Sequence, residues 1–272
     1  MSLVSLSRRV TFSSGHRYWK ADLSDVENRA LYGEWASPYS HGHNYVLWVT
    51  TRGEVDPENG MVVNIKWIDD VLQEKVVQIF HQKSINDEIP WFTNKSSTLE
   101  NLLDYFRIQL ESLPGNVELS HLKLEETETL YAEWHVDNNM TTLTRIYEFA
   151  ASHRLHVPEL SEEENLRLFG KCNRENGHGH NYVLEVTVTG SIQPETGMMV
   201  DIGALDRVVE ELVVERYDHR NLDLDIPELR GKNTTSEVVA QAIFDQLRGN
   251  IPAELVRVRL FETARNMFEV TV

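Results

Sequence analysis

In the second half of the chain, hydrophobic and polar positions change from a period of two to helical spacing and back. Residues 144–152 and 181–190 alternate between apolar and polar side chains, which is typical of half-buried strands. Residues 202–213 instead place their apolar side chains on one face of a helix. The pattern Thr234-x-x-Glu237 then predicts a capping box at the start of a second helix. Two further alternating segments predict strands at 255–262 and 266–272.

The first half of the chain repeats this order, and one heptapeptide occurs in both halves. HGHNYVL stands at residues 41–47 and again at 178–184, an offset of 137 residues (178 − 41). Five other landmarks keep the same offset: Phe12 and Phe149, His16 and His153, Gly33 and Gly170, Gly60 and Gly197, Thr98 and Thr235. Chance would not hold this register, so the chain is two copies of one domain. We predict domains at 1–136 and 144–272 with a polar linker at 137–143.

Each copy predicts an α+β domain with the order strand, strand, helix, helix, strand, strand. A long insertion separates the first two strands, and in it Ser24-x-x-Glu27 and Ser161-x-x-Glu164 predict a short capped helix that a glycine ends. Four strands and two helices leave sheet edges uncovered. Either a partner covers the open edge or several copies close a barrel together, so we expect oligomerisation.

Composition and charge exclude several classes of protein. The 272 residues are 41% hydrophobic and 25% charged, which is globular composition. No run of 18 apolar residues occurs and the first residues lack the order of a signal peptide, so neither a membrane span nor export is expected. The single cysteine, Cys172, favours a reducing, cytoplasmic location. A net charge of −17 argues against nucleic-acid or anionic-membrane partners.

Three histidines in each copy predict a metal site. His178 and His180 are two apart on a predicted strand, so both side chains point to one face, and His153 lies on the preceding strand. Three imidazoles at one point match a zinc site with an open fourth position. One such pair is often only a hydrogen-bonded surface pair, but the recurrence of the triple favours a metal, with iron left open. The first copy has the same triple: His16, His41 and His43.

Other candidate residues follow in the second copy. Cys172 lies in the long insertion, six residues before His178, where a nearby cation would favour the thiolate as base or nucleophile. Asp218 and His219 are adjacent, and a carboxylate beside an imidazole supports proton transfer, although neighbours in sequence need not bond each other. Glu262 ends a predicted strand and can accept paired hydrogen bonds or simply be solvated. The predicted capping box accounts for Glu237 without a function.

Together these residues resemble the 6-pyruvoyltetrahydropterin synthase family, which also contains the 6-carboxytetrahydropterin synthases of queuosine synthesis. The second copy carries the family pattern in order: SHRL, GKCNRENGHGHNY, GMMVDI, YDHRNLDLDIP, TTSE and ETARN. A cysteine six residues before HGHNY and an asparagine after E-T-x-x resemble the pyruvoyl enzymes more than the carboxy enzymes. The family has a tunnelling fold, in which antiparallel sheets of several subunits close a barrel with helices outside. This fold agrees with the predicted order of elements and with their uncovered sheet edges.

The resemblance implies a substrate, 7,8-dihydroneopterin triphosphate, and a catalytic zinc held by His153, His178 and His180. The product would be 6-pyruvoyltetrahydropterin, formed with loss of triphosphate and without a nicotinamide. Cys172 would be the base. The resemblance implies further roles by position: Asp218 and His219 as a proton relay from a neighbouring subunit, Glu262 as the anchor of the pterin ring, and Thr235 and Thr263 beside it.

The first copy departs from this pattern at the catalytic positions. Trp35 stands where the second copy has Cys172, and His81 and Gln82 stand in place of Asp218 and His219. Glu34, beside Trp35, is an alternative base that remains open. We expect this half to bind zinc and support the barrel without catalysing elimination. The favoured assembly is a trimer of chains that imitates a hexamer of single domains.

Three other functions remain open from the sequence. A 6-carboxy-5,6,7,8-tetrahydropterin synthase would have the same folds and metal ligands but would release acetaldehyde. A non-catalytic pterin- or zinc-binding protein would need neither Cys172 nor the Asp218–His219 pair, which argues against it. A cupin-like dioxygenase also uses a His-x-His strand, with iron, but the two amphipathic helices of each copy disfavour that class.

Overall fold

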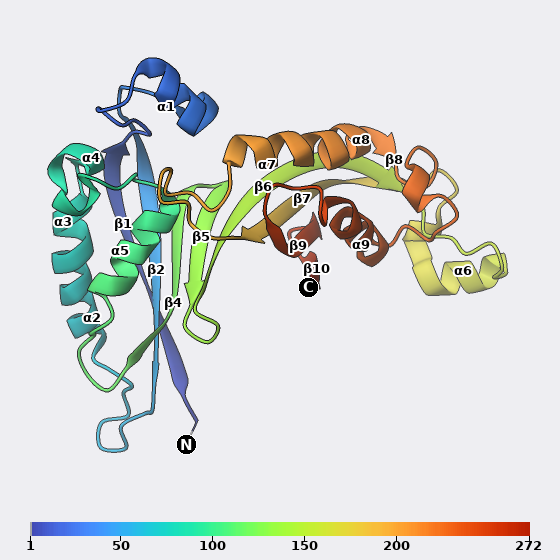
Figure 1. Ribbon diagram of the computed structural model, residues 1–272. Helices are drawn as coiled ribbons and strands as arrows, with labels where there is room; N and C mark the ends of the chain where they lie inside the picture. Colours follow the sequence, from blue (N-terminus) through green and yellow to red (C-terminus); the bar gives the residue numbers. More distant parts are fainter. Residues whose placement is uncertain (1) are drawn as a thin grey trace. The chain divides into compact units, whose positions relative to one another are not determined.

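The structure is a computed structural model that describes residues 2–272 (Figure 1). The chain forms two compact units, one of residues up to 143 together with 189–201, the other of residues 144–188 together with 202–272. The second unit lacks the segment 189–201 of its own repeat, because that segment packs with the first unit. The sequence predicted a division at 137–143, and the structure has a turn at 136–139, after which a strand begins at Met140.

The first repeat begins with two long antiparallel strands. They are β1 (Val4–His16) and β2 (His41–Gly53), and the register pairs Phe12 with Tyr45 and His16 with His41. The insertion between them holds α1 (Asp25–Tyr32) and the 3-10 turn η1 (Gly33–Trp35). A long helical stretch follows: α2 (Ile65–Leu72), the π-helical turn η2 (Gln73–Val77) and α3 (Gln78–Phe80).

Short elements and a second long helix complete this repeat. They are β3 (Lys83–Ser84), α4 (Ile85–Glu88), η3 (Pro90–Phe92), α5 (Leu99–Gln109), β4 (Glu118–Thr127) and β5 (Leu130–His135). The sheet of this repeat has the order β5-β4-β2-β1-β3. Helix α5 packs on β4 and β5, and α2 and α3 pack on β1, so the apolar core lies between the helices and one face of the sheet.

The second repeat has the same elements in the same order. They are β6 (Met140–His153), α6 (Glu162–Phe169), η4 (Gly170–Asn173), β7 (His178–Thr189), α7 (Ile202–Val209), the π-helical turn η5 (Glu210–Val214), α8 (Glu215–Tyr217), β8 (Arg220–Asn221), η6 (Pro227–Leu229), α9 (Ser236–Leu247), β9 (Glu254–Thr263) and β10 (Asn266–Thr271). Its strands have the order β10-β9-β7-β6, with β8 beside β6. The predicted α+β class and tandem repeat are confirmed. The sheet is not closed into a barrel in one chain, so barrel closure stays a prediction.

Each repeat has its own core, and an equivalent pair of stacked aromatic rings lies in both. Phe12 stacks on Tyr45 with ring centroids 5.1 Å apart, and Phe149 stacks on Tyr182 at the same distance. Stacked aromatic pairs contribute about 1 kcal/mol beyond the burial of their surface. Phe12 lies four residues before His16 on β1, and Phe149 lies four residues before His153 on β6. Each core therefore fixes the strand end that carries a histidine.

Local capping agrees with the sequence at two helices and differs at a third. Ser24 with Glu27 and Ser161 with Glu164 form complete capping boxes, as predicted. The capping box predicted at Thr234 is wrong: Thr235 is the N-cap of α9 and makes no side-chain capping bond. The Thr234 hydroxyl donates instead to Asp223, at 2.6 Å, because that carboxylate lies within its reach. Glu237 is therefore an exposed side chain that no cap explains.

Candidate active site

Three histidines of the second repeat meet at the ends of two neighbouring strands. His153 is the last residue of β6, and His178 and His180 are the first and third residues of β7. The ring centroid of His153 lies 4.7 Å from the ring centroid of His178 and 5.4 Å from that of His180. One ring nitrogen of each histidine lies within 4.8 Å of the other two. The sequence prediction that the three side chains converge is thus correct.

The hydrogen bonds around this triad leave one nitrogen of each ring for a metal. Nδ1 of His153 donates to the carbonyl of Thr234 at 2.7 Å, which directs Nε2 toward the other two rings. Each ring of this triad has one buried nitrogen without a hydrogen-bond partner among the described residues: Nε2 of His153, Nδ1 of His178 and Nε2 of His180. Burial lowers the pKa of His178 and His180, so both are neutral at pH 7 and can act as ligands. This donor set fits a zinc ion with an open fourth position.

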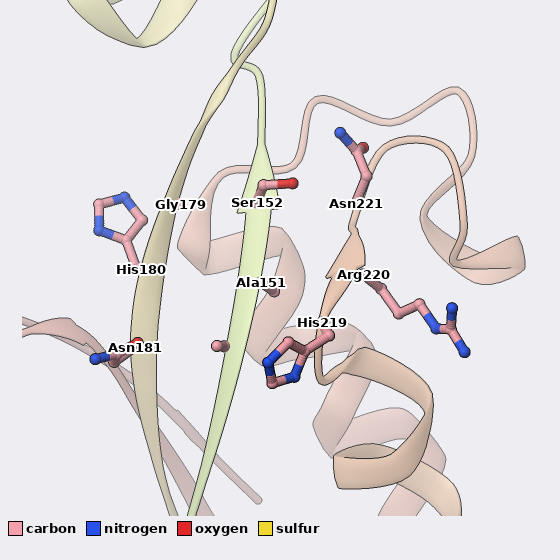
Figure 2. Close-up of a pocket in the computed structure, with 9 residues that line it drawn as sticks. Ala151, Ser152, Gly179, His180, Asn181, His219, Arg220 and Asn221 are labelled. Atoms are coloured by element: carbon pink, nitrogen blue, oxygen red, sulfur yellow. The ribbon is translucent and has the colours of Figure 1, made fainter.

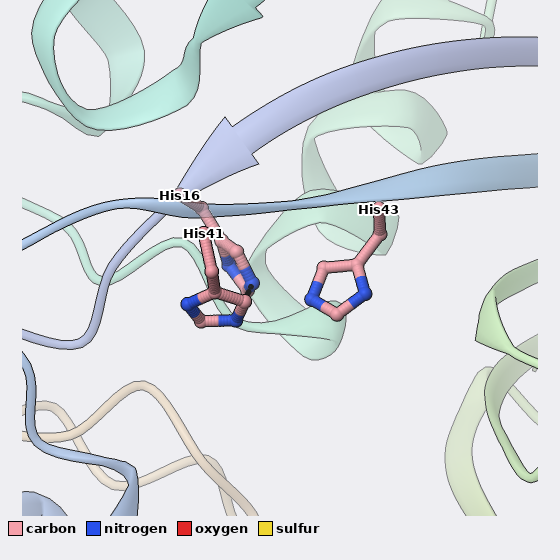
Figure 3. Close-up of side chains that lie close together, drawn as sticks. All are labelled: His16, His41 and His43. Carbon is pink, nitrogen blue, oxygen red and sulfur yellow. Dashed lines mark hydrogen bonds between the residues drawn. The ribbon is translucent and has the colours of Figure 1, made fainter.

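The first repeat has the same arrangement, shown in Figure 3. Nδ1 of His16 donates to the carbonyl of Ser97 at 3.0 Å, and Nε2 of His16 lies 3.1 Å from Nε2 of His41. Burial lowers the pKa of His16 to about 3 and that of His43 to about 4. The ligand atoms of His16, His41 and His43 lie within 4.8 Å of one another. Both repeats therefore fit a metal by the same geometry.

A glutamate approaches each triad from the strand that follows the helices. Oε1 of Glu262 lies 3.7 Å from Nε2 of both His153 and His180. Burial raises the pKa of Glu262, but hydrogen bonds from Asn266 and Ser236 and the nearby imidazoles outweigh it and leave the pKa below its usual value. Glu262 is thus ionised at neutral pH. In the first repeat, Glu126 lies 4.0 Å from His16.

Asp218 and His219 form a bonded pair in a sharp turn after α8. Oδ2 of Asp218 lies 2.7 Å from Nδ1 of His219, while Oδ1 accepts the backbone N–H of Ala150 at 2.7 Å. The backbone bond from Ala150 and the His219 bond hold the pKa of Asp218 low. His219 has a φ of +56°, a strained value for a residue with a side chain. The two residues therefore interact, a point that the sequence had left open.

The Asp218–His219 pair does not join the triad of its own repeat. His219 lines a surface hollow with residues of β6, β7 and β8, and its side chain is 84% exposed. Figure 2 shows the His180 ring extending away from His219, with β6 between them. The expected role of the pair at a site on another copy of the chain stays a prediction.

Cys172 lies in the turn η4, directly after the capped helix α6. Its side chain is partly exposed, and its carbonyl accepts the N–H of Leu155 at 3.0 Å, which ties the turn to the residues just beyond His153. Gly170, with a φ of +52°, ends α6 and starts this turn. In the first repeat, the indole of Trp35 packs at the matching position against a cluster of Tyr18, Tyr32 and Met198.

Two expected substrate-binding threonines have ordinary structural positions. Thr235 is the N-cap of α9, and the hydroxyl of Thr263 accepts the N–H of Arg265 in the turn between β9 and β10. Their binding roles stay predictions. Asn266, one residue beyond that turn, donates to Oε2 of Glu262 at 3.1 Å and so orients the carboxylate.

Sequence reasoning missed the glutamate at the start of the second long helix in each repeat. Glu100 is 2% exposed and accepts the N–H of Met199 at 2.9 Å, and Thr98 donates to the carbonyl of Gly197 at 2.7 Å. Both partners belong to the segment 189–201, which packs in the first unit. The recurrence of T-x-E in both repeats was a signal for this glutamate, but the sequence analysis attributed Glu237 to a capping box and assigned it no function.

The buried carboxyl of Glu100 predicts a pH-dependent stability. Burial raises its pKa above 4.5, although the N–H of Met199 partly opposes this. A raised folded pKa means that stability falls as pH rises from 4.5 through the folded value. Glu100→Gln keeps an acceptor for Met199 without the charge, so we expect it to stabilise the protein by about 1 kcal/mol at neutral pH. Thermal melting followed by circular dichroism should show this gain disappear at about pH 4. A gain that persists unchanged in acid would contradict the assignment.

Comparison with known proteins now places the chain. The model of the 6-pyruvoyl tetrahydropterin synthase family matches it twice, over residues 5–136 and 142–272. The chain belongs to the 6-pyruvoyl tetrahydropterin synthase family. Two copies of a family member therefore make up almost the whole sequence, as the repeat had predicted.

Individual relatives match about half of the chain. The human 6-pyruvoyl tetrahydrobiopterin synthase is 46% identical over 126 residues, which cover 46% of this chain and 87% of that protein. The Drosophila melanogaster synthase is 44% identical over 127 residues, covering 46% of this chain and 76% of that protein. The solved Caenorhabditis elegans 6-pyruvoyl tetrahydropterin synthase is 41% identical, with a TM-score of 0.46, and covers 48% of this chain and 94% of that one. These synthases are lyases, so the chain is a member of a lyase family.

A Pyrococcus furiosus dihydroneopterin monophosphate aldolase is also similar, with 37% identity over 93 residues, 34% of this chain and 75% of that protein. In residues 2–272, no helix is long and apolar enough to cross a membrane.

Proposed function

We propose that the chain is a zinc-dependent lyase that converts 7,8-dihydroneopterin triphosphate to 6-pyruvoyltetrahydropterin and triphosphate. The second repeat carries the reaction. The main support is the set of three partnerless ring nitrogens of His153, His178 and His180, in the repeat that also keeps Cys172 and the bonded Asp218–His219 pair. The first repeat has the same ring geometry without those three catalytic residues.

Each residue of the proposed site has a separate task. Zinc bound by the triad would polarise the oxygens of the substrate side chain and make the neighbouring C–H bonds more acidic. Cys172, as thiolate, takes a proton from the side-chain carbon, and the C–O bond to triphosphate breaks with its electron pair leaving on oxygen. His219, oriented by Asp218, exchanges protons with the side-chain oxygens. The redox change is internal to the substrate, so no nicotinamide is required.

Glu262 binds the ring of the substrate in this proposal. Its carboxylate is ionised and oriented by Ser236 and Asn266, so it can accept two hydrogen bonds from a 2-amino-pyrimidinone edge. Thr235 and Thr263 would flank the ring. The triphosphate needs positive charge in a chain of net charge −17, and Lys171 and Arg174, on either side of Cys172 and Asn173, are the nearest cations in sequence.

The first repeat serves a supporting role in the proposal. Trp35 stands at the position that matches Cys172. The Glu100 carboxylate accepts a hydrogen bond from the backbone of Met199, in the segment 189–201. This half would hold zinc through His16, His41 and His43 and shape the barrel, without turnover.

The proposed assembly is a homo-oligomer, with three chains as the favoured number. In the first unit, Met199 is 7% exposed and bonds to Glu100. The residue that matches Met199 is Val62, which is half-buried, and the residue that matches Glu100 is the exposed Glu237; neither makes such a contact among the described residues. A second copy that docks its Val62 segment on Glu237 would satisfy both surfaces in the same manner. Light scattering that gives a monomer would contradict this.

The product decides between the proposed reaction and its nearest alternative. Cys172 and Asn266 favour the pyruvoyl product over 6-carboxy-5,6,7,8-tetrahydropterin. Incubation of the zinc-loaded chain with 7,8-dihydroneopterin triphosphate, followed by mass spectrometry, should show 6-pyruvoyltetrahydropterin and triphosphate. The carboxy product with acetaldehyde would support the alternative reaction, and the absence of both products would reject catalysis on this substrate.

A further inference from the structure

A third cluster of metal-ligating side chains lies on the β4–β5 hairpin, away from both triads. His121 on β4 stands directly opposite His135 on β5, and Glu133 lies two residues before His135 on the same face of the sheet. The rings of His121 and His135 are stacked, with centroids 4.2 Å apart and planes inclined by 20°. Nε2 of His121 lies 3.3 Å from Oε1 of Glu133. One ligand atom of each residue lies within 4.8 Å of the other two.

This cluster and the first triad lie on opposite faces of the sheet. Leu122, Leu124 and Glu126 alternate along β4 toward the buried face, where Glu126 approaches His16 and His43. His121 has the opposite parity and only partial burial, so it points to the other face. Five residues of strand, roughly 17 Å, also separate His121 from Glu126 along β4. The cluster is therefore independent of the proposed active site.

The chemistry of the cluster fits a zinc-type ion. Two imidazoles and one carboxylate form a ligand set used by zinc sites, with a fourth position left for water. Bonds of about 2.0–2.1 Å in a tetrahedron place ligand atoms about 3.3 Å apart, and His121 and Glu133 already have that separation. The Nε2 atom of His121 is buried without a hydrogen-bond partner among the described residues. We propose that His121, Glu133 and His135 bind a divalent transition metal, with zinc as the expected ion.

The second repeat provides a comparison at the same register. There, Arg257 stands opposite Thr271, as His121 stands opposite His135, and Glu269 matches Glu133. Glu269 pairs with guanidinium groups, 3.8 Å from Nε of Arg257 and 2.6 Å from Nε of Arg259. The second repeat thus balances its glutamate with arginine, whereas the first repeat has two imidazoles at the positions of Arg257 and Thr271.

The proposed site has a cation beside it. Lys123 stands opposite Glu133, and its ammonium lies 3.0 Å from Glu125 and 3.9 Å above the Tyr131 ring. Those two partners attract the ammonium toward the hairpin turn, on the side of Glu133 away from His121. A metal at His121, Glu133 and His135 would join β4 to β5 next to the turn at 136–139, where the first repeat ends.

Metal counting on the full chain tests this proposal. The chain is stripped with a chelator, reloaded with Zn²⁺, freed of excess by gel filtration and measured by inductively coupled plasma mass spectrometry. The double variant with His121→Arg and His135→Thr carries the residues of the second repeat at this register, so it should fold. We expect it to hold one zinc ion per chain fewer than the wild type, and Glu133→Gln to weaken the same site.

A second readout separates this site from the two triads. In a chain with His16→Ala and His153→Ala, added Co²⁺ should still produce the visible absorption of a cobalt–imidazole site, and His121→Arg with His135→Thr should remove it. Equal zinc content in the wild type and the double variant, or no cobalt signal that depends on His121 and His135, would overturn the proposal. If the triads bind no zinc but the site at His121, Glu133 and His135 does, the result would contradict the proposed function and support this site.

Discussion

Replacing Cys172 with alanine should reduce product formation by roughly 100- to 10,000-fold, the range expected when a general base is lost. The zinc content should not change, because the three metal-facing nitrogens belong to His153, His178 and His180, and none of them bonds to Cys172. The turn η4 should also persist, since the Cys172 carbonyl, which accepts the N–H of Leu155, is kept. Product is measured by mass spectrometry and zinc by inductively coupled plasma mass spectrometry on the same samples.

A matched variant in the first repeat serves as the control. Glu34 lies beside Trp35, at the position that matches Cys172, and is the alternative base in that half. Glu34→Gln should leave the rate of product formation unchanged. Full activity in Cys172→Ala, or a large loss in Glu34→Gln, would show that Cys172 is not the general base.

Two inactive variants should restore activity when they are combined in one assembly. Cys172→Ala and His219→Ala should each be nearly inactive alone. His219 points away from the triad of its own repeat, so the relay should act on a neighbouring chain. When both variants are co-expressed, about a quarter of the sites should combine an intact Cys172 with an intact His219, because each site of a symmetric assembly draws the two from different chains.

The measurement is the rate of product formation by the purified mixed oligomer, compared with a mixture of the separately purified variants. The control is co-expression of Cys172→Ala with itself under a second tag, which should stay inactive. If the mixed oligomer is as inactive as its parents, Cys172 and His219 act from the same chain and the proposed neighbour contribution is wrong.

The hydrophobic pattern predicted the regular elements well because the core imposes it. The strand expected at 255–262 is β9 at Glu254–Thr263, and the helix expected at 202–213 is α7 with its continuation η5. Leu205, Val209 and Val213 in the helical segment and Leu255, Val258 and Leu260 in the strand are buried, so local pattern and global packing agree at these positions. The π-helical turn within the helix was not predicted, since apolar spacing hardly differs between the two helix types over one turn.

The candidate site was predictable where a residue type has one strong use, and was missed where a local rule gave another explanation. The repeated His-x-His pair predicted the triads because strand geometry sends alternate side chains to one face. Glu237 was dismissed as part of a capping box that Asp223 prevents by accepting the Thr234 hydroxyl. His121 and His135 lie 14 residues apart, and only the pairing of β4 with β5 brings them together.

The association of 189–201 with the first unit was also beyond the sequence. The segment makes two hydrogen bonds with the first repeat, from Thr98 to Gly197 and from Met199 to Glu100. Each joins residues 99 positions apart in the sequence. Long-range contacts of this kind leave no periodic pattern. The tandem offset shows only that Gly60 and Gly197 are equivalent, and it cannot show that their surroundings differ.

The central claim is that one chain contains two metal triads and that only the second supports catalysis. Removing one histidine from each triad tests it directly. Product formation and zinc content are measured on the wild type, His16→Ala and His153→Ala, with circular dichroism to establish that each variant is folded. Each variant should lose one zinc ion per chain, and His153→Ala should abolish formation of 6-pyruvoyltetrahydropterin while His16→Ala keeps most of it. Activity that survives in His153→Ala, or disappears in folded His16→Ala, would contradict the account.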